Sequence, residues 1–147
     1  MLAVKLKPGE RIVVNGAVLC NGNARNTLYF ANRASILREK DVMRVEEASS
    51  SVARAYYLVQ LMMLNADDLD IYRASYEKLV SKMLQTFTNS ELRQKLAESA
   101  KWVRSGDYYK ALVALRPARD YETALLSQTT INATFATRNE RPESTPS

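Results

Sequence analysis

The sequence contains no histidine and only one cysteine, Cys20, and these two shortages exclude several kinds of active site. A single thiol can form neither an internal disulfide nor a multi-thiolate metal centre. Without histidine, the chain lacks the usual general base and the commonest nitrogen ligand for zinc, so zinc hydrolysis and Ser-His or Cys-His catalysis are excluded. Glycine-rich nucleotide motifs such as GxGxxG are missing as well. We therefore expect no metal, no cofactor and no enzymatic activity, and the catalytic alternative that stays open is an enzyme built only on carboxylates, lysine or tyrosine.

Long hydrophobic runs are also missing. No apolar segment approaches the roughly 18–20 residues that a membrane-spanning helix needs. The first ten residues carry Lys5, Lys7 and Glu10 instead of the apolar segment of a signal peptide. The chain has 147 residues, of which 46% are hydrophobic, and this is enough for a folded core. These features predict a cytoplasmic protein without membrane contact.

Short β-strands separated by turn residues are predicted for the first third of the chain. The turns fall at Pro8-Gly9, at Asn15-Gly16 and at Asn21-Gly22-Asn23, and Asn15-Gly16 is a strong signal for a two-residue hairpin. Five strands are expected between these turns, at 2–7, 11–14, 17–20, 27–30 and 35–37. A sheet this thin must pack on a helix or on another copy of itself. We expect a small antiparallel β-module at 1–46.

The hydrophobic period becomes helical after residue 48. Helices are expected at 52–64, 67–87, 88–105 and 107–126. Thr88-Asn89-Ser90-Glu91 matches a capping box for the third helix, and Gly106 is suited to end it. Pro117 is expected to kink or split the fourth helix near Arg116. The sequence thus predicts an α+β chain, with a unit of three to four helices at 47–126 and a polar, flexible tail at 127–147.

Residues 1–45 hold the entire excess of positive charge. They contain eight basic and three acidic residues, which accounts for the net charge of +5. If the first and last strands lie side by side, one basic edge contains Lys5, Lys7, Arg38, Lys40 and Arg44. Such an edge suits the phosphates and bases of single-stranded RNA. The alternative interpretation is that these side chains protect strand edges from aggregation and pair with Glu39 and Asp41.

The candidate partner-binding residues of the helical half are Tyr56, Tyr109 and Met62. Neighbouring residues on a helix point about 100° apart. One member of each pair, Tyr56-Tyr57 and Tyr108-Tyr109, is therefore expected inside while the other reaches outward. Met62 and its methionine neighbour offer an adaptable surface for a partner helix. Burial in the helical core is the alternative for these residues, and their helical spacing favours it.

Several segments, in order, resemble the FlbT family of flagellin regulators from alphaproteobacteria. They are LKPGE at 6–10, NG at 15–16, ASILREKD at 34–41, AYY at 55–57 and YYKAL at 108–112. The resemblance covers residues 1–125. It implies a post-transcriptional regulator that associates with the 5′ untranslated region of flagellin mRNA and alters its lifetime, generally as a repressor. It also implies FlaF as a functional companion.

The segments at 1–10 and 36–42 are, in addition, similar to the carbon-storage regulator CsrA. That likeness implies five strands, a strand-exchanged dimer, and RNA bound where the first strand of one subunit adjoins the last strand of the other. The critical arginine of that surface matches Arg38. Its basic residue on the first strand matches Leu6, so only Lys5 and Lys7 are available to replace it.

Two functional hypotheses follow. In the first, a dimeric, non-catalytic repressor binds the flagellin mRNA 5′ leader through the five basic residues and promotes its decay or blocks its translation. In the second, the chain is an adaptor whose helical half binds FlaF, flagellin or another flagellar assembly factor, and any effect on RNA is indirect. Leu6 favours the adaptor, whereas the basic surplus favours RNA binding.

Overall fold

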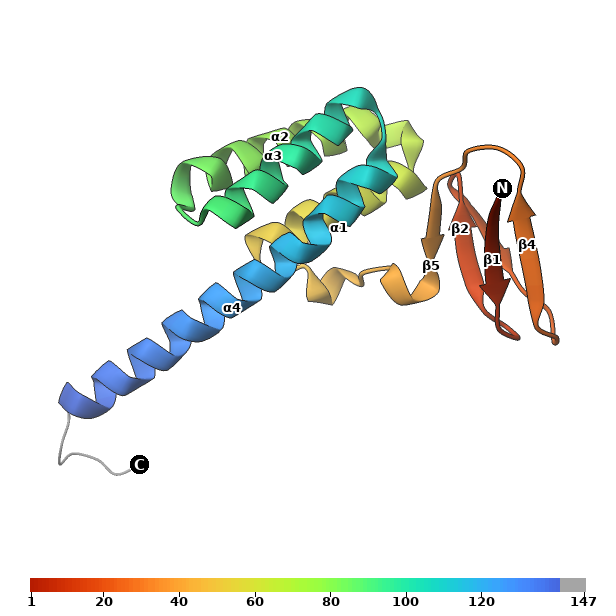
Figure 1. Cartoon of the computed structure of the whole chain (residues 1–147). Coiled ribbons are helices and arrows are strands. Elements are labelled where there is room, and N and C mark those ends of the chain that lie inside the picture. The colour runs from red at the N-terminus through yellow and green to blue at the C-terminus, as the bar shows by residue number, and fades with distance from the viewer. Residues whose placement is uncertain (141–147) are drawn as a thin grey trace.

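The computed structural model describes the backbone of residues 1–140 and the side chains of residues 1–127 except Ala66. Five strands come first: β1 (Leu2–Leu6), β2 (Arg11–Val14), β3 (Ala17–Cys20), β4 (Asn26–Phe30) and β5 (Ile36–Arg38). Within the described residues, four α-helices follow: α1 (Ser51–Leu64), α2 (Leu69–Thr86), α3 (Ser90–Ser105) and α4 (Tyr108–Glu140). Short 3₁₀ helices lie at Glu39–Asp41, Val45–Glu47 and Ala66–Asp68. The α+β fold predicted from the sequence is confirmed, and Figure 1 shows the strands beside one end of the helices.

The five strands are divided between two antiparallel sheets. Strand β1 pairs with β4, so that Leu6 lies opposite Asn26. In the other sheet β2 is central, and its Val13 lies opposite Val18 of β3 and Leu37 of β5. The first and last strands therefore belong to different sheets and do not form the continuous edge that the side-by-side arrangement requires.

The three-stranded sheet forms the middle layer of the molecule. Side chains alternate between the two faces of a strand. Ile12 and Ile36 face β1 and β4, where they join a small core with Val4. Val13 and Leu37 join the core of the helices instead. The expectation that a thin sheet needs a helical partner is confirmed for β2 and β5, whereas all four residues of β3 are exposed.

The Asn15-Gly16 turn connects β2 to β3, as the sequence predicts. Both residues have positive φ, 49° and 86°, and this conformation favours asparagine and glycine. A side chain at Gly16 would lie 3.3 Å from the carbonyl oxygen of Met63, so the turn lies against the end of α1. The Asn15 Oδ1 accepts from the amide of Ser35 at 2.9 Å, which connects the turn to the segment before β5.

The helix ends show which of the predicted caps form. The Ser50 hydroxyl accepts from the amide of Ala53 and caps α1. Helix α3 is capped by Asn89, whose Oδ1 accepts from the amide of Leu92 at 2.9 Å. The capping box expected from Thr88 and Glu91 is therefore wrong: the N-cap is Asn89, and Leu92, three residues later, cannot complete a box. Gly106 ends α3 with a φ of 83°, as predicted.

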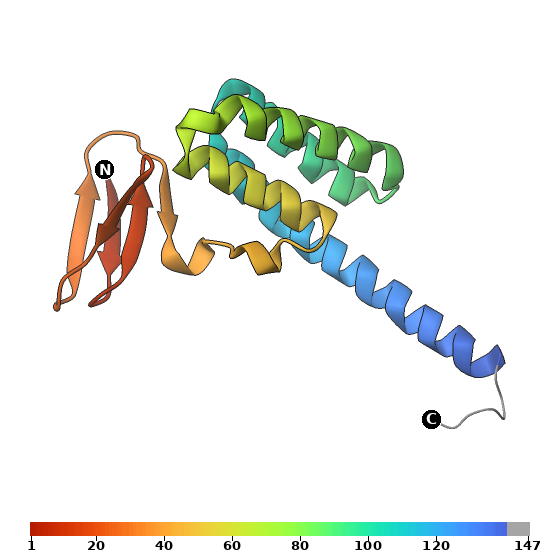
Figure 2. The same ribbon diagram turned by 180° about the vertical axis from the view of Figure 1, so that it is seen from behind.

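Helix α4 is longer and more regular than the sequence predicts. It continues through Pro117 and is not split there. The amide that proline lacks would bond to the carbonyl of Val113, so the helix continues past Pro117 with one hydrogen bond fewer. The helix runs on to Glu140 and projects past the other helices (Figures 1 and 2). The predicted tail is thus helical from 127 to 140, and 141–147 lie outside the described residues.

The linker between β5 and α1 is attached to the helices at Asp41. The Tyr56 hydroxyl donates to the Asp41 carbonyl at 2.8 Å, and Arg116 of α4 forms an ion pair with the Asp41 carboxylate at 3.5 Å. Met43, two residues later, is buried in the helical core. None of the helices in the described part of the chain is long and apolar enough to cross a membrane.

Candidate nucleic-acid interface

A groove of about 950 Å³ lies at the end of the strands where β1 stops and the 3₁₀ helix after β5 begins. Its walls come from the β1–β2 turn, from the start of β4 and from the end of β5. Its lining includes five basic residues, Lys5, Lys7, Arg25, Arg38 and Lys40, and two acidic residues, Glu10 and Glu39. We call this the basic groove. Four of the five basic residues selected from the sequence meet here.

Arg38 is held within the groove by Glu10. Its Nε donates to Glu10 Oε2 at 3.2 Å, and its Nη2 lies 2.8 and 3.0 Å from the two carboxylate oxygens. The same Nη2 donates to the carbonyl of Lys5 at 2.7 Å, so β5 contacts β1 at this point although the two strands do not pair. The backbone amide of Lys7 and the guanidinium of Arg38 lower the pKa of Glu10. Glu10 is therefore ionised and neutralises Arg38.

A second pair neutralises the other acidic residue of the groove. Arg11 donates to Glu39 through Nη2 at 2.8 Å, through Nε at 3.2 Å and through its backbone amide at 3.3 Å. The guanidinium and the amide lower the pKa of the Glu39 carboxyl. The alternative interpretation expected the selected basic residues to pair with Glu39 and Asp41, but Glu39 pairs with Arg11 and Asp41 with Arg116. Of the selected residues in the groove, only Arg38 has an acidic partner within the described part of the chain, and that partner is Glu10.

The remaining cations of the groove are unbalanced. Among the described side chains no ion pair is formed by Lys5, Lys7, Arg25 or Lys40, and all four are exposed. Because both carboxylates are already paired, the groove presents four uncompensated positive charges. A surface of this kind attracts the phosphates of a nucleic acid, and the attraction weakens as salt rises.

Leu6 stands where the likeness to CsrA implies a basic residue, and its side chain points into the protein. Leu6 is 5% exposed and belongs to the small core between the sheets. Lys5 and Lys7 are its neighbours on β1 and in the following turn, and both point to solvent. The basic character of this part of the groove thus comes from the residues that flank Leu6.

Arg25 is a groove residue that the sequence analysis did not select. It precedes β4 in a loop organised by Asn21, whose Nδ2 donates to the carbonyls of Lys7 at 2.7 Å and Ala24 at 2.9 Å. Asn26 donates to Asn21 Oδ1 at 2.9 Å and completes the loop. The Asn21-Gly22-Asn23 segment could have indicated that Arg25 lies in an ordered loop, because asparagine side chains bond to neighbouring backbone in turns.

Arg44, the fifth basic residue selected from the sequence, lies outside the groove. Its side chain is 79% exposed, and its Nε pairs with Glu47 at 3.0 Å within the linker. It is therefore a surface cation with its own partner. This makes it a natural control for the groove residues.

The aromatic and methionine candidates are placed mainly in the core. Tyr56 is 2% exposed and Met62 is 3% exposed. Tyr56 bonds to Asp41, and the guanidinium of Arg119 lies 5.0 Å from its ring centroid. Neither residue offers an exposed docking surface, because both fill the space between helices. Tyr109 is half-buried and lines a separate hollow between the strands and the helices.

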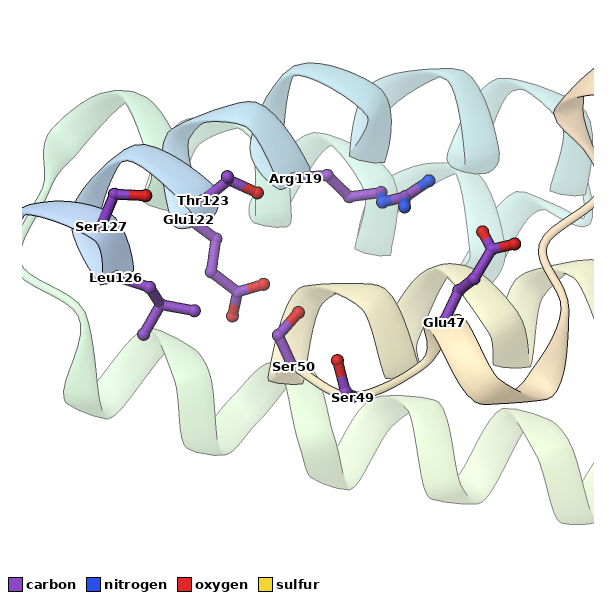
Figure 3. Close-up of a pocket in the computed structure, with 8 residues that line it drawn as sticks. All are labelled: Glu47, Ser49, Ser50, Arg119, Glu122, Thr123, Leu126 and Ser127. Atoms are coloured by element: carbon purple, nitrogen blue, oxygen red, sulfur yellow. The ribbon is translucent and has the colours of Figure 1, made fainter. Parts of the chain in front are cut away.

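A hollow of about 540 Å³ lies where α4 passes the start of α1 (Figure 3). Glu122 extends from α4 toward Ser50, and its two carboxylate oxygens accept from the amide of Val52 at 3.1 and 3.3 Å. Glu122 is only 4% exposed. An acidic group at the N-terminus of a helix satisfies free amides and interacts favourably with the helix dipole. This residue therefore joins α1 to α4.

No cluster of three or more potential metal ligands occurs among the described residues. The basic groove offers exposed positive charges and hydrogen-bond donors, and both of its carboxylates are paired with arginines. Exposed positive charge of this kind attracts anionic groups.

Comparison with known proteins agrees with the resemblance seen in the sequence segments. A family model described as "Flagellar protein FlbT" matches residues 2–126. The chain is 36% identical to the "Probable flagellum biosynthesis repressor protein FlbT" of Rhodopseudomonas palustris (strain TIE-1), over 86% of this chain and 98% of that protein. It is 34% identical to the protein of the same description from Caulobacter sp. (strain K31), over 82% and 92%.

The "Flagellum biosynthesis repressor protein FlbT" of Caulobacter vibrioides (strain ATCC 19089 / CIP 103742 / CB 15) is 33% identical, over 82% of this chain and 86% of that protein. These names describe regulators and not enzymes. No solved structure matches the chain. The family model covers most of the chain, including every strand and the basic groove, and the chain belongs to the FlbT family of flagellar proteins.

Proposed function

We propose that this protein represses flagellum biosynthesis by binding the 5′ leader of flagellin mRNA in the basic groove. The names of its relatives support the regulatory role, because they are described as flagellum biosynthesis repressors. The observation that carries RNA binding is the gathering of Lys5, Lys7, Arg25 and Lys40, unpaired and exposed, around a groove whose acidic residues are already neutralised. A repressor that acts on mRNA would work in the cytoplasm.

The β-module at 1–46 would be the RNA-binding part, and Arg38 would position the groove. Its guanidinium joins the turn after β1 to β5 by binding Glu10 and the Lys5 carbonyl together. RNA phosphates would be contacted first by the free lysines and Arg25. Binding would block translation of the leader or expose it to decay.

A homodimer is part of this proposal. Val18 on β3 and Tyr29 on β4 are 64% and 68% exposed. Large apolar side chains on outer strands favour contact with a second surface. Sedimentation of the purified protein over a range of concentrations tests this point, and a monomer throughout would remove the dimer from the proposal.

The adaptor hypothesis, with a FlaF-like protein as partner, names three contact residues. Two of them, Tyr56 and Met62, are buried in the helical core. Tyr109 is the candidate that retains some exposure. Pull-down of a FlaF-like protein by wild type and Tyr109→Ala distinguishes this hypothesis from direct RNA binding.

The test of direct binding is a titration of the full chain against flagellin 5′ leader RNA and a scrambled RNA of equal length, at two salt concentrations. The variants are Lys5→Gln and Lys7→Gln, with Arg44→Gln as the matched control. The proposal expects stronger binding to the leader, weaker binding of both groove variants and unchanged binding of the control. Equal, feeble binding to both RNAs would reject it.

A further inference from the structure

A second hollow, of about 580 Å³, lies at the opposite end of β5 from the basic groove. One wall comes from the hairpin residue Asn15 and from the loop between β4 and β5, including Arg33 and Ser35. The other wall comes from the end of α3 and the start of α4, including Trp102 and Lys110. Figure 1 shows these segments meeting where the strands adjoin the helices.

Trp102 is held firmly in this hollow but is not enclosed. Its indole packs against the helical core and also lines the hollow. The residue lies in the last turn of α3, just before the left-handed Gly106, where the following chain turns into α4. The ring is therefore fixed by packing on one part of its surface and accessible on another.

Positive charges surround the Trp102 ring. Lys110 Nζ lies 4.5 Å from the ring centroid, and Lys101 Nζ lies 5.3 Å from it. The Lys110 side chain is 48% exposed, and its Nζ also lies 3.9 Å from the Asp107 carboxylate. Arg33, at the other wall, is 76% exposed and pairs with Asp107. A base could displace an exposed lysine from the ring at little cost in free energy, because solvated cation–π contacts are weak.

A partly exposed aromatic ring with exposed cations beside it has the composition of a platform for single-stranded nucleic acid. Bases stack on the ring, and the cations contact the neighbouring phosphates. A site for a purely apolar partner would not place two lysines at the ring. The charge around Trp102 has the same sign as the charge of the basic groove.

We propose that Trp102 is a base-stacking site for single-stranded RNA, with Lys101 and Lys110 contacting the adjoining phosphates. This inference rests on the proposed RNA-binding function and adds a contact outside the basic groove. Ser35 in the hollow and Arg38 in the groove lie at the two ends of β5, about 10 Å apart along the strand.

The chain provides its own reporter for this site, because Trp102 is its single tryptophan. The experiment titrates the full-length protein with short single-stranded RNA and with an abasic oligonucleotide of equal length. Tryptophan emission reports on the ring, and the anisotropy of a labelled RNA reports on binding itself. The RNA is expected to quench the emission in parallel with binding, and the abasic oligonucleotide is expected to bind more weakly without quenching.

Variants separate stacking from a structural role. Trp102→Leu is expected to weaken RNA binding about tenfold, and Trp102→Phe, which keeps a ring, by a smaller factor. Phe87→Leu is the control, because it removes another half-buried aromatic ring packed on the helical core, at the end of α2. It is expected to bind RNA like wild type. If Trp102→Leu fails to fold, quenching of the wild type and the affinity of Trp102→Phe decide.

Two results would overturn the inference, and they differ in their meaning. RNA that binds fully by anisotropy but leaves tryptophan emission unchanged removes the stacking site and leaves the basic groove intact. RNA that does not bind at all removes the proposed function and the stacking site together.

Discussion

The side chain of Gln60 forms two hydrogen bonds with the backbone of a single residue, Met43. Gln60 Oε1 accepts from the Met43 amide at 2.7 Å, and Gln60 Nε2 donates to the Met43 carbonyl at 2.9 Å. Gln60 lies on α1 and is 2% exposed. The linker that leaves the strands is thereby fixed to the helices in the way a neighbouring strand would fix it.

Replacing Gln60 with leucine should destabilise the protein by about 2 kcal/mol or more, because the amide and the carbonyl of Met43 are then buried without partners. The free energy of unfolding in urea measures this effect. Gln94→Leu, at an exposed position on α3, is the matched control and should change stability by less than about 0.5 kcal/mol. Equal stability of the two variants would show that water replaces Gln60.

Stability should decrease at alkaline pH because of Tyr76. Its hydroxyl donates to Ser99 Oγ at 2.7 Å, and Ser99 donates to the Ala111 carbonyl at 3.0 Å. Burial raises the pKa of Tyr76 from 10.0 to about 12. The unfolded chain therefore loses this proton first, so the contribution of Tyr76 is complete below pH 10 and is lost between pH 10 and about 12.

The loss amounts to about 2–3 kcal/mol over that interval. Tyr76→Phe should be less stable than wild type at neutral pH by about 1 kcal/mol and should lack this part of the alkaline decrease. Urea unfolding of both proteins at neutral and alkaline pH provides the comparison. Parallel decreases in the two proteins would assign the effect to other groups.

Removing the negative charge of Glu10 should strengthen RNA binding. Glu10→Gln releases Arg38 from its ion pair and adds one uncompensated positive charge to the groove. The expected result is a several-fold higher affinity at low salt and a steeper salt dependence, by about 0.7 in the logarithmic slope for a single strand. A lower affinity would mean that the ion pair is needed to shape the groove.

Each free lysine of the groove should contribute one phosphate contact. Lys5→Gln should reduce the slope of log affinity against log salt by about 0.7. Arg44→Gln removes the same charge outside the groove and should leave the slope unchanged. Titrations at three or more salt concentrations give the slope, and the same change in both variants would point to a diffuse field without a localised site.

Glu122 of α4 caps the N-terminus of α1, so its removal should destabilise a helix that is distant in the sequence. Glu122→Ala removes the acceptor of the Val52 amide and should reduce the free energy of unfolding by about 1–2 kcal/mol. Glu77→Gln, an exposed acidic residue on α2, is the control. Thermal unfolding of the two variants measures the difference, and it should also show that Glu122→Gln retains part of the stability.

Local patterns were sufficient to predict the five strands and the four α-helices, but not the 3₁₀ helices or the continuation of α4 beyond residue 126. The Asn15-Gly16 turn, Ser50 and Gly106 specify their own conformations through nearest neighbours, and the predicted elements begin or end where these residues lie. The strand pairing was not predictable in the same way. Pairing of β1 with β4 and of β2 with β5 depends on contacts between distant segments, and the alternation of side chains along each strand is compatible with several orders.

The candidate site was predictable in part for the same reason. Lys5, Lys7, Arg38 and Lys40 were recognisable from charge and from the resemblance, and they do meet in one groove. Their pairing state was not recognisable, because the partner of Arg38 is Glu10, on the turn after another strand. Burial of Tyr56 and Met62 was the alternative suggested by helical spacing, and the packing of α1 against α2 and α4 places both side chains inside.

The distribution of the strands between two sheets also sets an order for folding. The hairpin of β2 and β3 closes through a two-residue turn, whereas the β1–β4 and β2–β5 pairs join strands that are distant in the sequence. Non-local pairs of this kind form later than local ones. The basic groove needs the turn after β1, the start of β4 and the end of β5 at once. A nascent chain therefore completes the basic groove only when residues 38–40 have left the ribosome.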